Sequence, residues 1–438
     1  MGRPTVRFIA AIAICASIFG CASPKRFDSV SRAASFDSLW HALVDCYAYL
    51  EVDDDWLAMR GKYRDAVIRS QTRMAYLSSL ATMLSDLDDP HVIFNRLPEY
   101  AKRVDGAEWT CVAKEAFLFG GRVWARFDDA AIDRSTATAP ATQPSDFCEV
   151  VAIGQITSPG LILQMLGGEP GHKLNATTVD IHGVEHVVSL ICPPSKPTTS
   201  APVVSQPSQE PSSPKFVRYT MNPSGIGYII ITTFGDSRVV EQFDTALDCL
   251  KDCRALVLDV RQNGGGTAEV RDKVLGRFVK GSRPCGYFTY RRRGLLIGMT
   301  FSSWYKPLWR VSERGTTYHR PLVVLTDSAT GSAAEMFAFA LQDVRNATLI
   351  GQRTRGAAAT IAYITLPDSL ELQYSAYPIH RLDGRSIEGV GVAPDIEVPY
   401  SRQGMLTDPN VEIRRWNMQI LNVAVTKADS LASSYMSH

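Results

Sequence analysis

The sequence has almost no net charge, and it lacks the short motifs that mark bound zinc, haem or nucleotides. Its 438 residues carry a formal net charge of +1, with 21% charged and 45% hydrophobic residues. This balance gives no reason to expect a nucleic-acid partner. Nine cysteines are present, but they do not follow zinc-ligand spacing and no haem-attachment motif occurs. We therefore expect no metal and no organic cofactor.

The N-terminus lacks a hydrophobic run long enough to cross a membrane. Its apolar stretch, residues 8–19, follows two arginines and is typical of the hydrophobic region of a secretory signal peptide. Residues 18–21, IFGC, which overlap the end of this stretch, resemble a lipobox whose cysteine, Cys21, becomes lipidated. Plain secretion and an uncleaved anchor are the alternatives. We expect residues 1–21 to be a lipoprotein-type signal peptide, and the protein to be exported to the periplasmic side and held to the membrane through a lipid anchor only.

The pattern of apolar residues changes several times along the chain. Apolar residues recur every three or four positions at first, then short β-like runs follow, and a Pro/Ser-rich stretch marks a boundary. We expect the following parts after the signal: a helical N-terminal segment at 22–104, a β-rich module at 105–192, a linker at 193–215, an α/β core at 216–405 and a C-terminal helical segment at 406–438.

The α/β core is predicted from apolar strands that alternate with helical stretches from residue 216 onward. Runs such as ALVLDV and PLVVLT are apolar throughout rather than at every second position. Such strands are buried on both faces of a sheet. Functional residues are expected at the carboxyl ends of these strands, where loops lead into helices.

Two of these strand ends contain unusual residues. DVRQNGGG, residues 259–266, leaves its strand through three glycines, which either make a sharp turn or expose backbone N–H groups to an anion. A phosphate loop is the competing interpretation, but neither GxxxxGK[ST] nor GxGxxG is present. The second end, TDSATGSAAEMFAFAL, offers Ser328, Thr330 and Ser332 among small residues. Locally, Ser332 is either a helix N-cap or a nucleophile.

Five stretches, in order, resemble one known family. They are GYIIITTF, LVLDVRQNGGG, PLVVLTDSATGSAAE, IGQRTRG and GRSIEGVGVAPD. The chain is similar to the carboxyl-terminal processing proteases, the tricorn core peptidases and interphotoreceptor retinoid-binding protein, strongly over 225–400 and loosely over 40–195. The resemblance implies an α/β fold: a crotonase-like (ClpP-like) catalytic domain with a helical N-terminal segment and a degenerate PDZ-like β-rich module.

The resemblance also implies which residues act. The pattern Ser-Ala-small-Glu places the nucleophile at Ser332, and its small neighbours leave room for an acyl group. The N–H of Ala333 and that of Gly264 or Gly265 would form the oxyanion hole, in which one donor is typically worth about 3 kcal/mol.

The general base departs from the processing proteases. Their lysine would stand at Ala357, so the Ser–Lys pair is absent. Tricorn-like members use a histidine and a glutamate instead, and these positions match His91 and Glu388. His91 would act as base and then acid, and Glu388 would orient its ring. The tricorn pattern has a serine just before its histidine, where this chain has Pro90, so Glu388 would reach His91 directly or through water.

These features predict an exported serine-type peptidase that hydrolyses peptide or unfolded-protein substrates through a Ser-His-Glu acyl-enzyme mechanism; an oligomer is possible. The alternative is a catalytically inactive ligand- or peptide-binding protein on the same scaffold. If an activated serine is absent, the binding function is favoured.

Overall fold

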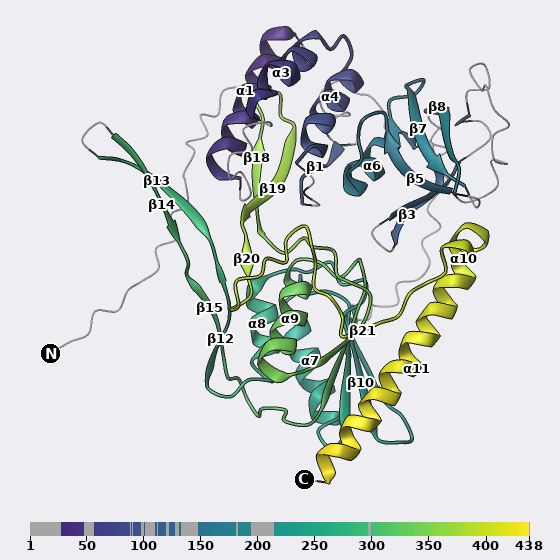
Figure 1. Cartoon of the computed structure of the whole chain (residues 1–438), viewed down its shortest axis with the longest axis vertical. Helices are drawn as coiled ribbons and strands as arrows, with labels where there is room; N and C mark the ends of the chain where they lie inside the picture. The colour runs from purple at the N-terminus through teal and green to yellow at the C-terminus, as the bar shows by residue number, and fades with distance from the viewer. Residues whose placement is uncertain are drawn as a thin grey trace, which may run out of the picture.

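The computed structural model describes residues 28–437, apart from 48–56, 88, 90, 98–99, 101–109, 112, 120–121, 128–130, 133–147, 181–182, 194–213 and 297–298 (Figure 1). The predicted signal peptide with Cys21, residues 194–213 of the predicted linker and Pro90 lie outside the described residues. No helix in the described part of the chain is both long and apolar enough to cross a membrane.

A six-stranded sheet forms the centre of the catalytic half. Its strand order is β21-β17-β16-β11-β10-β9; all neighbours are parallel except β9, which pairs antiparallel to β10. The strands are β9 (Val217–Met221), β10 (Ile226–Ile231), β11 (Ala255–Asp259), β16 (Leu322–Thr326), β17 (Thr348–Gly351) and β21 (Ile396–Glu397).

Both faces of this sheet are covered by helices (Figure 1). One face packs on α7 (Arg238–Cys249), α8 (Ala268–Leu275) and α9 (Ala333–Arg345), and the other on α11 (Pro409–Met436). Along β11, Leu256 and Leu258 join the core on the α7–α9 side and Val257 the core on the α11 side. The continuous apolar run of this strand is thereby explained. The predicted boundary at residue 405 falls inside α10 (Arg402–Thr407), and α11 packs on the core sheet.

The N-terminal part begins with α1 (Ser29–Cys46), α3 (Arg60–Arg69) and α4 (Arg73–Ser85). After these helices comes a strand, β1 (Ile93–Asn95), so the segment expected to be helical to residue 104 also contains a strand. β1 pairs antiparallel with β19 (Glu371–Tyr377), which pairs with β18 (Thr360–Thr365). A hairpin from the catalytic half therefore completes a small sheet with the N-terminal part (Figure 1).

The β-rich module is a five-stranded antiparallel sheet in the order β3-β4-β5-β7-β8. Its elements are β2 (Thr110–Cys111), β3 (Ala113–Phe119), β4 (Arg122–Phe127), β5 (Cys148–Ile153), α6 (Pro159–Met165), β6 (Gly167–Gly168), β7 (Lys173–Val179) and β8 (Glu185–Ile191). The module, the N-terminal helices and the β18–β19 hairpin share one hydrophobic core. The expected separate segments are thus packed together.

The chain between α8 and β16 forms an excursion from the core. β12 (Ser282–Phe288) pairs with β15 (Leu308–Ser312) and with β20 (Ile379–His380). Between them, β13 (Tyr290–Leu296) and β14 (Met299–Tyr305) form a two-stranded ribbon that projects from the body of the molecule (Figure 1).

Candidate active site

Ser332 lies at a strained turn between β16 and α9. Its backbone has φ 51° and ψ −122°, a conformation that favours glycine. Its N–H donates to the carbonyl oxygen of Ala357 at 2.7 Å and to Glu335 Oε2 at 3.0 Å, and these bonds hold the turn. A strained strand-to-helix turn is one way that enzymes expose a nucleophilic serine. The helix N-cap and the nucleophile are therefore compatible functions of one residue.

The loop before Ser332 is bonded to the loop that follows β11. Thr330 is fully buried, and its Oγ1 donates to the carbonyl oxygen of Val260 at 3.0 Å. The N–H of Gly331 donates to the carbonyl oxygen of Asn263 at 3.0 Å. Thr330 thus has a structural function, and its bonds bring Ser332 against the glycine loop.

The glycine loop contacts Ser332 so closely that one position must be glycine. Gly265 has φ 106°, and a Cβ there would lie 2.7 Å from Ser332 Cβ. The N–H of Gly265 donates to Asn263 Oδ1 at 2.9 Å, and the amide of Asn263 donates to the carbonyl oxygen of Ile231 at 2.9 Å. Gly264 and Gly265 are the two alternatives that the sequence offers for the second oxyanion donor, and the N–H of Gly265 already has a partner in Asn263.

Gly264 and Ala333 offer backbone N–H groups beside Ser332. Neither N–H has a hydrogen-bond partner among the residues that the structure describes. Ala333 opens α9, where the first N–H groups of a helix have no partner within the helix and its dipole favours negative charge. These two groups are the available donors for a developing oxyanion.

Glu335 ties the serine turn to the following loop. Its carboxylate is fully buried and accepts from Thr354 Oγ1 at 2.5 Å and from the N–H groups of Gly356 and Ala357 at 2.6 and 2.8 Å, in addition to Ser332. Burial raises the pKa of Glu335 to about 7, against the lowering effect of these donors. The Ser-x-x-Glu spacing of a capping box is the sequence signal for this interaction.

His91 and Glu388 form a buried pair, as the resemblance predicts. His91 Nδ1 lies 3.0 Å from Glu388 Oε1, and both side chains are less than a tenth exposed. Glu388 Oε2 accepts from the N–H groups of Ala358 and Ala359 at 2.7 and 2.6 Å. This carboxylate therefore reaches the ring directly, and it is held in place by backbone donors from the loop next to Ser332.

Ser375 is a third member of the pair that the sequence interpretation missed. It is fully buried, its Oγ lies 3.1 Å from His91 Nδ1, and it donates to Glu388 Oε1 at 3.2 Å. A serine hydroxyl thus stands beside the histidine although Pro90 precedes it in the chain. Because Ser375 is 284 residues from His91 in sequence, no local pattern could connect them.

The pairing of β1 with β19 brings these residues together. Ile93 lies opposite Gln373, and His91 is two residues before Ile93 while Ser375 is two residues after Gln373. In an antiparallel pair this register places His91 opposite Ser375. Gln373 Nε2 also donates to the carbonyl oxygen of His91 at 3.1 Å, which extends the pairing to the candidate base.

Asp89 adds a second carboxylate next to His91. Its Oδ1 accepts the N–H of His91 at 2.8 Å, and its buried Oδ2 has no partner in the described part of the chain. Burial and the charge of Glu388 raise the pKa of Asp89. Burial would lower the pKa of His91, but the hydrogen bond and charge of Glu388, with the charges of Asp89 and Glu335, outweigh it, so the pKa of His91 is raised.

Ser332 and His91 are linked through the loop at residues 357–359. Ala357 accepts from Ser332, and the next two residues donate to Glu388, which holds His91. No hydrogen bond joins Ser332 Oγ to the His91 ring, although the structure describes both residues. The structure therefore brings the serine and the histidine–glutamate pair to one place without a direct bond between them.

A metal ion is the other ligand that this cluster could bind. Asp89, His91 and Glu388 each offer a ligand atom, and these atoms lie within 4.8 Å of one another. The Nδ1 atom of His91 is, however, engaged with Glu388 and Ser375. A ring fixed at Nδ1 by a carboxylate leaves Nε2 for proton transfer.

Sequence comparisons agree with the resemblance. Residues 225–398 match peptidase family S41. The C-terminal processing peptidase of Tetradesmus obliquus chloroplasts is 26% identical over 174 residues, which cover 40% of this chain and 35% of that protein. The carboxy-terminal-processing protease of Bartonella bacilliformis is 28% identical over 193 residues, which cover 42% and 41%. The matched part thus spans only about two fifths or less of the length of these relatives. The resemblance to this family is confirmed for residues 225–398.

Among solved structures, mature CPAF has a similar fold, with a TM-score of 0.58 and 14% identity over 92% of this chain and 98% of that chain. At this identity the likeness concerns the fold, which is mixed α/β. It extends beyond the family match at residues 225–398 to nearly the whole chain.

Proposed function

From the membership of residues 225–398 in peptidase family S41, we propose that this chain is an exported serine-type peptidase that hydrolyses peptide bonds. The observation that carries the proposal is the His91–Glu388 pair at 3.0 Å, fixed by the same loop that accepts the N–H of Ser332. The core corresponds to a crotonase-like domain and residues 105–192 to a degenerate PDZ-like module that presents peptide substrate. Export and a lipid anchor at Cys21 are part of the proposal.

In the first step, Ser332 Oγ attacks the carbonyl carbon of the scissile peptide, and its proton passes to Nε2 of His91. Glu388 accepts the hydrogen bond from Nδ1–H and stabilises the imidazolium that forms. The oxyanion accepts hydrogen bonds from the N–H groups of Ala333 and Gly264. His91 then protonates the leaving amine as the C–N bond breaks, which leaves an acyl-Ser332 ester.

In the second step, a water molecule gives a proton to His91 Nε2 and attacks the ester carbon. Collapse of the second tetrahedral intermediate returns the proton to Ser332 Oγ and releases the new carboxyl terminus. Ser375 and Asp89 take no proton in this scheme; they hold the ring and adjust its basicity. The bond between Ser332 and His91 forms when substrate fills the site, because catalytic hydrogen bonds often tighten only in the substrate complex.

The second candidate function is a catalytically inactive binding protein on the same scaffold. The observation that favours it is the lack of a hydrogen bond between Ser332 Oγ and the His91 ring, both in the described part of the chain. On this hypothesis the Ser332 turn would be retained for packing alone, and the serine would have ordinary reactivity.

Labelling with a fluorophosphonate probe separates the two functions. We expect the purified protein to be labelled at Ser332, with the modified peptide located by mass spectrometry, and labelling to be lost in His91→Ala and in Glu388→Gln. His172→Ala, a half-buried histidine of the β-rich module, is the matched control and should label normally. A folded protein that is not labelled, or is labelled equally well in His91→Ala, would overturn the peptidase proposal and favour the binding function.

A further inference from the structure

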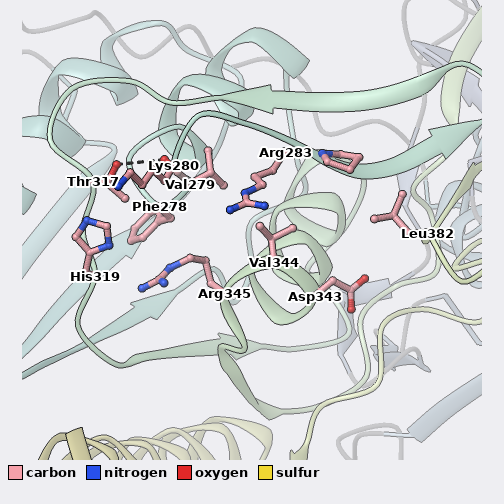
Figure 2. A pocket seen from close by; sticks show the side chains of 11 residues that line it. Phe278, Val279, Lys280, Arg283, Thr317, His319, Asp343, Val344, Arg345 and Leu382 are labelled. Carbon is pink, nitrogen blue, oxygen red and sulfur yellow. Dashed lines mark hydrogen bonds between the residues drawn. The ribbon is translucent and has the colours of Figure 1, made fainter. Parts of the chain in front are cut away.

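A cavity of about 410 Å³ lies at the end of α9 that is farthest from Ser332 (Figure 2). Its walls come from residues 278–280, which follow α8, from the start of β12, from Thr317 and His319, from the last turn of α9 and from Leu382. Because α9 has 13 residues, its ends are about 20 Å apart. The cavity is therefore separate from the candidate active site.

Three cationic side chains line this cavity. Lys280, Arg283 and Arg345 form no ion pair in the described part of the chain. The one carboxylate in the wall, Asp343, is engaged with Arg381, which donates to it through Nε at 2.9 Å and through Nη2. Since the whole chain has a formal net charge of only +1, this concentration of positive charge is local.

Arg345 carries an unsatisfied donor. Its Nη2 donates to the carbonyl oxygens of Tyr318 and Arg320 at 3.2 and 3.4 Å, but its Nε is buried and has no partner in the described residues. Buried donors in native proteins nearly always have a partner. Burial without a nearby carboxylate lowers the pKa of Arg345.

Beside these charged groups and the polar Thr317 and His319, the wall contains apolar side chains. Phe278, Val279 and Val344 stand between the cations, and Figure 2 shows Arg283 and Arg345 entering the same space from β12 and from α9. A cavity of this size falls in the range that accommodates small organic ligands, and it exceeds what a single inorganic oxyanion fills. Guanidinium groups recognise carboxylate and phosphate oxygens through paired N–H donors.

We propose that this cavity binds a small organic anion, with a carboxylate or phosphate group placed between Arg283 and Arg345 and an apolar portion against Phe278 and Val344. The shared chemistry is an oxyanion joined to an apolar body, whether it comes from the end of a peptide or from a phosphate ester. Binding at this site is independent of the serine chemistry proposed above, because none of its residues belongs to that site.

Calorimetric titration of the full chain tests the proposal with four probes: N-acetyl-leucine, its uncharged amide, phenyl phosphate and inorganic phosphate. We expect saturable binding of N-acetyl-leucine or phenyl phosphate, and binding at least about tenfold weaker for the amide and for inorganic phosphate, which lack the charge and the apolar portion respectively. Stronger binding of N-acetyl-leucine would identify a peptide end as the source, and stronger binding of phenyl phosphate a phosphate ester.

The location is tested by Arg283→Gln, which removes one exposed guanidinium and leaves the core untouched. We expect it to weaken binding about tenfold. Arg310→Gln, an exposed arginine on β15 that bonds Ser282 and does not line the cavity, is the matched control and should bind normally. Equal binding of the acid and its amide, unchanged binding by Arg283→Gln, or no saturable binding of any probe would each overturn the proposal.

Discussion

The two halves of the candidate active site are built in different ways. On the serine side, Glu335 accepts from Ser332 only three residues away, and further bonds join the turn to neighbouring loops at the edge of a parallel sheet. On the histidine side, His91 meets Ser375 and Glu388 across 284 and 297 residues of sequence. The serine half therefore combines a local turn with bonds to neighbouring loops, whereas the histidine half is held mainly by tertiary pairing.

The two halves also differ in how easily local opening of the structure would displace them. β1 contains three residues and pairs with β19 through only these positions, whereas β11 and β16 are fully buried central strands. Local opening is easiest where few pairings and little buried surface hold an element. We therefore expect the base to be more easily displaced than the nucleophile, and the following predictions test that comparison.

The largest effect is expected on the serine side, from Ser332→Ala. Loss of the nucleophile should lower the rate of peptide hydrolysis by about 10⁴-fold or more, without a large change in the free energy of unfolding. Ser332→Gly should be equally inactive but more stable by about 1 kcal/mol, because glycine relieves the positive φ. Urea unfolding of the two variants measures this difference. If Ser332→Gly is no more stable than Ser332→Ala, the turn is not strained.

The next effect concerns the carboxylate that holds the serine turn. Glu335→Gln leaves a buried amide facing N–H donors that now lack an acceptor, so we expect about 3 kcal/mol of destabilisation. The pKa of Glu335 in the folded protein, about 7, is above its ordinary value of 4.5. The unfolded chain therefore releases this proton first as pH rises, and the stability contributed by protonated Glu335 is present below pH 4.5 and lost as pH rises through about 7.

Unfolding measurements of the wild type and Glu335→Gln at several pH values test whether the stability contributed by Glu335 falls as pH rises. The stability of the wild type relative to the variant should fall by about 1.4 kcal/mol per pH unit between the two pKa values. Glu371→Gln, on β19 and away from the serine turn, is the matched control and should track the wild type. A difference between wild type and Glu335→Gln that does not vary with pH would show that Glu335 titrates normally.

The difference between the serine half and the histidine half also explains which parts of the site the sequence could predict. The core strands and helices, the position of Ser332 and the pairing of His91 with Glu388 follow from apolar runs, loop residues and a family resemblance. Ser375 could not be predicted, because its function arises only from the register of β1 on β19. The choice between Gly264 and Gly265 likewise depends on the Asn263 side chain, which takes up one N–H.

The sequence also could not predict that the helical segment and the β-rich module pack against each other. Composition separates them, but residues of α4, β4 and the β18–β19 hairpin pack into one core. Hydrophobic patterns show that a face is buried and do not show which partner covers it. Long-range partners are therefore the part of this structure that sequence patterns leave open.

A smaller effect is expected from Ser375→Ala, on the histidine side. The substitution removes a donor to Glu388 and a contact of His91 Nδ1, so the ring should lose part of its orientation. We expect the rate of fluorophosphonate labelling to fall about tenfold, with Ser375→Cys in between. Tyr377→Phe, an exposed side chain on the same strand, is the matched control. Unchanged labelling would show that Glu388 alone fixes the ring.

The smallest effect is expected from Asp89→Asn, and it should show as a shift in pH dependence. Asn keeps an acceptor for the N–H of His91 but removes a negative charge that helps to raise the pKa of the ring. His91 must be neutral to accept the serine proton, so the labelling rate rises as pH increases through the pKa of His91. With Asp89→Asn this rise should occur at lower pH, and the plateau should stay unchanged within about twofold. A rise that keeps the wild-type midpoint would mean that Asp89 is already protonated in the wild type. In that case Glu388 would be the main source of the charge that makes His91 a stronger base, and the histidine side would depend on a single tertiary contact.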